Sequence, residues 1–93
     1  MPLEFEWSPE KAAANYRKHK VSFEEAVTAF GDPLAAIFWD EEHSDAEQRE
    51  LLVGHSYDGR LLLVYFTERG GRIRLISTRL ATRRERRDYE EKR

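Results

Sequence analysis

Six consecutive apolar residues in the middle of the chain constrain its fold more than any other feature. Residues 61–66 read Leu-Leu-Leu-Val-Tyr-Phe and contain no charge. A strand that is apolar on both faces is typical of the centre of a sheet, where both faces are covered. We therefore expect helices on one face and, on the other, either a second buried layer or a binding partner. An exposed second face would be an interaction surface.

Strand-like runs surround this segment. The turn Tyr57-Asp58-Gly59 precedes it, and Arg69-Gly70-Gly71 returns the chain into one more run. Short apolar runs joined by such turns predict an antiparallel meander. One further strand is expected before the meander, after the proline that follows the second helix. The predicted strands cover residues 34–39, 49–56, 60–68 and 72–79.

Capping signals place two helices before the meander. Ser8-Pro9 is typical of an N-cap followed by a first helical position, which predicts a helix over residues 9–18. Ser22 and Glu25 match the S-x-x-E capping box, in which a hydroxyl and a carboxylate each accept from a free amide. We expect this second helix to end at Gly31-Asp32-Pro33, with the glycine as its C′ residue.

A third helix is expected at the end of the chain, because Thr82 and Glu85 form another capping box and the helical pattern continues to about Tyr89. The predicted fold class is α+β. Two N-terminal helices pack on a four-stranded antiparallel sheet, and the C-terminal helix completes one edge. The 93 residues suit a single domain over residues 1–93, without repeats or linkers.

Composition excludes several classes of protein. The chain has no cysteine, which rules out disulfides and thiolate metal sites and favours a reducing cytoplasm. No apolar stretch approaches the roughly 18 residues of a membrane span, and the N-terminal residues do not resemble a secretory signal. G-x-S-x-G, P-loop and G-x-G-x-x-G motifs are absent, so hydrolase-triad, nucleotidase and dinucleotide functions have no support.

Charge is distributed very unevenly along the chain. Residues 69–93 carry ten Lys or Arg against four Asp or Glu, a net +6, so the remaining residues carry −8 of the total of −2. Arginines clustered on folded elements suggest a footprint for a polyanion. The acidic remainder disfavours general nucleic-acid binding and confines any RNA contact to one edge of the protein.

The last helix breaks a local rule in this basic segment. Arg83 and Arg84 occupy its first turn, where the helix dipole favours negative charge. A bound phosphate would relieve the conflict, and Arg79 at the end of the preceding strand can reach the same place. Pairing of these arginines with acidic side chains is the alternative, and the pattern does not decide between the two.

Several other residues have both a structural and a functional interpretation. Arg72 and Arg74 share one strand face, where they either flank a groove or contact only solvent. Lys18 and His19 end the first helix, where cations complement the dipole, and His19 is also a candidate base. Glu47 is either a salt-bridge partner of Arg49 on one strand face or a general base.

Two more candidates remain near these residues. Tyr89 is either a core aromatic or a proton donor. His43 has carboxylates at Asp40 and Glu47, but nothing resembles H-E-x-x-H, so no metal site is predicted.

The ordered residues resemble the BrnT family of toxins. The N-terminal part carries Phe5-Glu6-Trp7-Ser8-Pro9-Glu10-Lys11, Lys18-His19 and Val21-Ser22-Phe23-Glu24-Glu25-Ala26. The second half carries Thr67-Glu68-Arg69, Arg79-Leu80-Ala81-Thr82 and Glu85-Arg86 with Tyr89. No single piece is diagnostic, but the set in this order is specific and covers nearly the whole chain.

The resemblance implies a RelE-like α+β fold and a ribonuclease of a bacterial type II toxin-antitoxin system that arrests translation. It also implies a BrnA-like antitoxin encoded in the same operon. The antitoxin neutralises the toxin by binding it, and the pair represses the operon, so the toxin meets operator DNA only through its antitoxin. A RelE-like mechanism uses the substrate's own 2′-hydroxyl and needs neither metal nor cofactor.

In this mechanism Arg79 and Arg83 are expected to clamp the phosphate and Arg74 to steer RNA. Glu47 or His19 is the candidate base, and the other, or Tyr89, is the candidate acid. Further expected RNA contacts are Lys18, Arg49, Arg72, Arg84 and Arg86. A non-catalytic RNA- or ribosome-binding module and a protein-interaction domain with an acidic partner are the alternatives.

One residue departs from the family pattern. Lys20 follows His19 where the family usually has glycine. If the helix ends there in a left-handed conformation, a lysine strains the turn and can displace His19.

Overall fold

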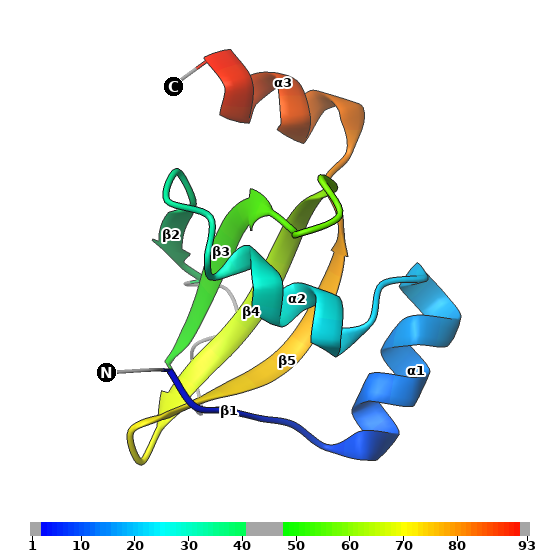
Figure 1. Cartoon of the computed structure of the whole chain (residues 1–93), viewed down its shortest axis with the longest axis vertical. Coiled ribbons are helices and arrows are strands. Elements are labelled where there is room, and N and C mark those ends of the chain that lie inside the picture. Colours follow the sequence, from blue (N-terminus) through cyan, green and yellow to red (C-terminus); the bar gives the residue numbers. More distant parts are fainter. Residues whose placement is uncertain (1–2, 41–47, 92–93) are drawn as a thin grey trace.

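The computed structural model describes residues 3–40 and 48–91 and shows three helices and a five-stranded sheet over these ranges (Figure 1). The elements are β1 (Phe5–Glu6), α1 (Pro9–His19), α2 (Phe23–Ala29), β2 (Ala36–Trp39), β3 (Arg49–His55), β4 (Leu61–Arg69), β5 (Arg72–Leu80) and α3 (Arg83–Glu91). In the described ranges, no helix has the length and apolar character needed to cross a membrane.

The strands lie in the order β1-β5-β4-β3-β2, so the meander is correct and β4 is central as predicted. The prediction of a purely antiparallel four-stranded sheet was wrong, because β1 adds a fifth strand parallel to β5. Phe5 pairs with Ile73 and Glu6 with Arg74 in this ladder. The short strand is held by its side chains: Phe5 packs edge-to-face on Phe30 with ring centroids 4.9 Å apart.

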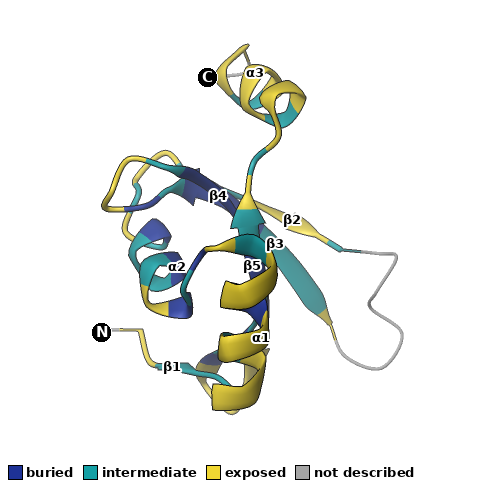
Figure 2. Ribbon diagram, turned by 90° about the vertical axis from the view of Figure 1, so that its right-hand side faces the viewer, coloured by how far each residue is buried: buried dark blue, intermediate teal, exposed yellow. Residues whose placement is uncertain are grey.

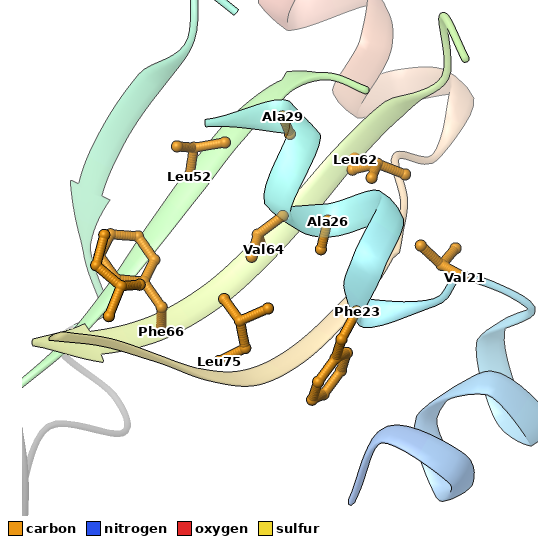
Figure 3. Close-up of a cluster of buried hydrophobic side chains, with 10 residues drawn as sticks. Val21, Phe23, Ala26, Ala29, Leu52, Leu62, Val64, Phe66 and Leu75 are labelled. Carbon is orange, nitrogen blue, oxygen red and sulfur yellow. The ribbon is translucent and has the colours of Figure 1, made fainter. Parts of the chain in front are cut away.

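One face of the sheet, which we call the core face, is covered by α2. The helix contributes Phe23, Ala26 and Ala29, each with no exposed surface. Figure 3 shows these side chains against the strand residues Leu52, Leu62, Val64, Phe66 and Leu75. Burying apolar area at roughly 25 cal/mol per Å² makes this cluster the main stabilising feature of the fold.

Helix α1 lies beside β5 rather than squarely on the sheet (Figure 1). Asn15 is its only buried residue within the described ranges, and its amide bonds to the backbone of β5 as a neighbouring strand would. Its Nδ2 donates to the Thr78 carbonyl at 2.9 Å, and its Oδ1 accepts from the Thr78 amide at 3.1 Å. Nδ2 also donates to the Val21 carbonyl, which fixes the chain between the two helices.

The predicted capping box of α2 forms only in part. Ser22 Oγ accepts from the Glu25 amide at 3.0 Å as expected. The Glu25 carboxylate instead accepts from the Arg60 guanidinium and from Ser56 Oγ, which lie in the turn between β3 and β4. The Arg60 hydrogen bonds are the main reason that the pKa of Glu25 is lowered. This long-range ion pair connects α2 to the sheet. The local sequence pattern around Glu25 does not predict it.

The two helix ends also differ from the simplest expectation. Gly31 does not adopt a left-handed conformation, and α2 ends instead at Phe30 in right-handed geometry. Lys20 ends α1 with φ 60° and ψ 31°, so the lysine occupies the left-handed position that usually holds glycine. Its amide still donates to the Tyr16 carbonyl at 2.9 Å. The strained turn anticipated from the sequence is therefore present.

The opposite face of the sheet, which we call the open face, is covered only in part. Figure 2 shows α2 on the other side, α1 beside β5 and α3 beyond the end of the sheet. The prediction that α3 completes a sheet edge was wrong, since β1 and β2 are the edges. Leu61 and Leu63 are buried on the open face because Tyr89 and Ala81 pack against them.

Candidate nucleic-acid interface

Strand register places Arg79 on the open face. Arg79 pairs with Leu63, whose side chain belongs to the cluster beneath Tyr89. Tyr65, which packs on that cluster, also lies on the open face. Arg74 lies between Ile73 and Leu75, which both point into the core, so its side chain faces the open side. The open face thus carries arginines from β5 on one part and apolar residues on the other.

Arg79 is held by a carboxylate at the start of α3. Its Nη1 donates to Glu85 Oε1 at 2.8 Å and its Nη2 to Glu85 Oε2 at 2.9 Å. Nη1 also donates to the Leu80 carbonyl. Bidentate pairs of this kind fix the plane of the guanidinium as well as its position. The alternative left open by the sequence, pairing with an acidic side chain, is therefore realised for Arg79.

The same carboxylate caps α3. Glu85 Oε1 accepts from the Thr82 amide at 2.8 Å, and Thr82 Oγ1 accepts from the Glu85 amide at 3.1 Å, so the predicted capping box is complete. The Arg79 hydrogen bonds, together with the Thr82 amide, lower the pKa of Glu85 to about 2. The pair in turn raises the pKa of Arg79, with a smaller contribution from Tyr65. Both charges persist at every physiological pH.

The two arginines at the start of β5 pair with the N-terminal segment. Arg74 Nη1 lies 3.1 Å from Glu6 Oε2, and Arg72 Nε lies 3.4 Å from Glu4 Oε2. Glu6 belongs to β1 and Glu4 immediately precedes this strand, which the predicted four-stranded sheet did not include. These partners reduce the charge that Arg72 and Arg74 present, although both side chains stay partly exposed.

The arginines of α3 differ from those of β5 in their ion pairing. Arg83, Arg84, Arg86 and Arg87 are exposed, and none forms an ion pair with any residue of the described ranges. Glu85 partly offsets the unfavourable charge in this first turn through its capping bonds. Exposed guanidinium groups at a helix N-terminus remain a suitable place for a phosphate, as the sequence predicted.

Tyr89 packs against the apolar cluster on the open face, as expected of a core aromatic, and its hydroxyl makes a hydrogen bond within the protein. Its ring contacts the cluster of Val53, Leu61 and Leu63. Its hydroxyl donates to the Leu34 carbonyl at 2.7 Å. The side chain thereby anchors α3 to the segment before β2.

The remaining predicted residues are spread over the molecule. His19 is partly buried at the end of α1, and within the described ranges it makes no hydrogen bond or ion pair. Lys18 is exposed beside it. Arg49 begins β3 opposite Thr67, on the strand next to the centre. Glu47 and His43 lie outside the described residues.

Sequence reasoning missed a polar group beside Tyr89. Asp32 accepts from the His55 amide at 2.8 Å and from the Leu34 amide at 2.9 Å, and the first of these bonds is the main cause of its lowered pKa. The His55 ring contacts Tyr89 edge-to-face, with centroids 6.0 Å apart. Asp32 thus fixes the segment that receives the Tyr89 hydroxyl. Its only sequence signal was the Asp-Pro turn.

A groove of about 690 Å³ lies between α3 and the β2 side of the open face. Sequence reasoning anticipated an interaction surface on this face but not the groove itself. Its lining residues are Leu34, Ala36, Phe38, Leu51, Val53, Leu63, Glu85, Asp88 and Tyr89.

Comparison with known proteins decides the family. A family profile described as "Ribonuclease toxin, BrnT, of type II toxin-antitoxin system" matches residues 7–85 of the chain. The chain belongs to the BrnT family. This confirms the resemblance seen in the sequence and its toxin-antitoxin context.

A solved structure supports the same assignment at the level of the fold. The crystal structure of the Brucella abortus ribonuclease toxin BrnT matches with a TM-score of 0.68 and 21% sequence identity, over 88% of this chain and 100% of that chain. Among curated proteins, no sequence matches this BrnT chain.

Proposed function

We propose that this BrnT chain is a metal-independent endoribonuclease that arrests translation in the cytoplasm, with its RNA substrate bound on the open face beside Arg79. Ribonuclease activity follows from the family description. The placement rests on one observation: Glu85 holds Arg79 in a fixed orientation where β5 meets α3, next to the exposed arginines of the first helical turn.

The reaction requires little of the protein besides charge and two proton transfers. The substrate's 2′-oxygen forms a bond to the adjacent phosphorus, and the bond from phosphorus to the 5′-oxygen breaks. A base accepts the proton of the 2′-hydroxyl, and an acid protonates the departing 5′-oxygen. The products are a 2′,3′-cyclic phosphate and a 5′-hydroxyl, as in a RelE-like mechanism.

Positioned cations are the larger contribution to such a reaction, because negative charge increases on the phosphoryl oxygens in the transition state. Arg79 remains cationic and oriented, and Arg83 adds an exposed charge at the start of α3. Arg74 supplies weaker steering because Glu6 already pairs with it. We retain Glu47 or His19 as the base, and the other or Tyr89 as the acid; general acid-base assistance adds typically about 10² to 10⁴-fold.

The proposed cellular partner is a BrnA-like antitoxin encoded in the same operon. It neutralises the toxin by binding it, and the complex represses the operon. The family description names a toxin-antitoxin system, which supports a partner of this kind.

The test uses purified chain and a short RNA labelled at both ends, in buffer containing EDTA. We expect cleavage that leaves a 2′,3′-cyclic phosphate, and no cleavage when the attacking 2′-hydroxyl is replaced by hydrogen. Arg79→Ala should lose at least about 100-fold in rate. Arg87→Ala is the matched control, because it removes one exposed guanidinium from the same region and should retain near wild-type activity.

Two results would contradict the proposal. Cleavage that stops in EDTA and returns with a divalent cation would exclude the metal-independent mechanism. Equal activity of Arg79→Ala and Arg87→Ala would exclude the assigned role of Arg79. RNA that binds in a salt-dependent manner but stays intact would instead identify a non-catalytic binding module.

A further inference from the structure

We propose that the groove between α3 and β2 is the docking site for a basic amphipathic segment of the antitoxin. This inference rests on the toxin function proposed above and specifies where its partner binds. The occupant has apolar side chains that enter the groove and Lys or Arg side chains along its border.

The first argument is exposed apolar surface on a densely charged protein. Phe38 lines the groove and is 53% exposed, and Leu34 at its border is 57% exposed. Ile37 and Trp39, the neighbours of Phe38 in β2, are 56% and 60% exposed but lie on the opposite face of the strand and do not line the groove. Large apolar side chains that gather on one edge mark interaction surfaces, whereas single ones scattered over a surface do not.

The groove is preformed, which lowers the cost of binding. Its floor is strand backbone with Leu51, Val53 and Leu63, and two of these side chains also pack beneath Tyr89. One wall is α3, which is fixed by the Tyr89 bond to Leu34 and by the Glu85 bond to Arg79. A segment that enters therefore finds the wall formed by α3 and the floor formed by the strands already in place.

Charge indicates the kind of occupant. Among the described residues that line the groove there are two carboxylates and no cation. Arg79 offsets Glu85, but Asp88 makes no ion pair with any described residue. Glu90 and Glu91 follow at the C-terminal end of α3, where the helix dipole is also negative. The charge in the groove lining is therefore negative at Asp88, which favours a cationic side chain over a phosphate at that point, so a protein segment fits the groove better than the substrate does.

The position also accounts for neutralisation. A segment in the groove contacts Glu85, which holds Arg79 on the adjacent part of the open face. The bound antitoxin therefore blocks access of RNA to Arg79, although most of its own contacts are with the groove and not with the arginines. Removal of the Phe38 side chain should weaken antitoxin binding while leaving the ribonuclease activity intact.

Adjacent residues of β2 provide a matched pair of variants. Phe38 pairs with Leu51 and faces the groove, whereas Ile37 pairs with Leu52 and faces the opposite side. Because the two are similarly exposed, Phe38→Ser and Ile37→Ser remove comparable apolar surface from opposite faces. Asp88→Lys reverses the charge of the groove border on an exposed helix position, where folding is not at risk.

The probe is the purified product of the gene adjacent to the toxin gene, titrated calorimetrically into each full-length variant at two salt concentrations. We expect Phe38→Ser to weaken binding by about 30-fold or more, as loss of an aromatic anchor does, and Ile37→Ser by less than about 3-fold. Asp88→Lys should weaken binding by about 10-fold at low salt and by less at high salt. RNA cleavage by Phe38→Ser without the antitoxin should match the wild type.

Three results would overturn the inference. Equal loss of binding in Phe38→Ser and Ile37→Ser would place the partner on the β2 edge as a whole. Tighter binding of Asp88→Lys would show an acidic occupant. Loss of RNA cleavage in a folded Phe38→Ser, with unchanged antitoxin binding, would assign the groove to RNA. If the wild type binds the antitoxin but cleaves no RNA, the ribonuclease proposal fails while the groove is still tested by the same titrations.

Discussion

Replacing Glu85 by Gln should test how the start of α3 is held in place. The substitution removes the charge that pairs with Arg79 but keeps an oxygen that can accept from the Thr82 amide. We expect the Arg79 side chain to lose its fixed orientation and α3 to detach more often. The capping geometry itself should survive, so the variant isolates the ion pair.

The magnitude follows from the pKa of Glu85, which falls from 4.5 to about 2 in the folded chain. At about 1.4 kcal/mol for each unit, this difference corresponds to an upper bound of about 3 kcal/mol. The Glu85 side chain is 36% exposed, and exposed pairs usually contribute about 0.2 to 1 kcal/mol. We therefore expect Glu85→Gln to destabilise the docked helix by about 1 kcal/mol at neutral pH.

The sign of the pH dependence is fixed by the direction of the shift. A carboxyl group whose folded pKa is lowered stabilises the protein above its unfolded pKa and loses this contribution as pH falls toward the folded value. The wild type should therefore lose the pair's contribution between about pH 4.5 and pH 2. Glu85→Gln should not show this loss, so the two proteins should converge at the acid end.

Urea unfolding and amide hydrogen exchange of α3, both measured across this pH range, give the comparison. Exchange is needed because α3 has no buried residue among those described and can open without global unfolding. Glu90→Gln is the control on the same helix, since Glu90 makes no ion pair with any described residue. A difference between wild type and Glu85→Gln that is absent at neutral pH, or equal in Glu90→Gln, would refute the reasoning.

Two further substitutions test the fold around α1. Lys20→Gly should stabilise the chain by about 1 kcal/mol in urea unfolding, because it relieves a left-handed conformation that L-residues adopt at a cost; an unchanged midpoint would show that the turn is not strained. Asn15→Ala should cost about 3 kcal/mol, because the Thr78 amide, the Thr78 carbonyl and the Val21 carbonyl lose a buried partner. A cost below about 1 kcal/mol would mean that these groups find other partners.

Local sequence signals predicted most of the elements well. The start of α1, the start of α2 and all three meander strands lie within one or two residues of their predicted bounds. The run at residues 61–66 lies in the central strand β4: β3 and β5 pair with its two edges, α2 covers one of its faces, and Tyr89 and Ala81 pack on the other. The Thr82 and Glu85 signal produced a complete capping box.

Long-range pairing was the part that local signals did not reveal. Glu25 matched a capping box as well as Glu85 did, yet its carboxylate pairs with Arg60 in the turn between β3 and β4. β1 joined the sheet because Phe5 reaches Phe30 and because Glu6 reaches Arg74. Both outcomes depend on which residues the fold brings close, and none of the three pairs is close in sequence.

For the candidate site, the sequence alone determined the charge asymmetry, the capping box before the terminal helix and the family. Only the tertiary structure decided that Arg79 is paired with Glu85, that Tyr89 anchors α3 on Leu34, and that Phe38 borders an apolar groove. The physical reason is that composition and periodicity fix which side chains a strand or helix presents. The partner of each side chain depends on how the layers pack, so only the structure shows that the Glu85 carboxylate lies 2.9 Å from the Arg79 guanidinium.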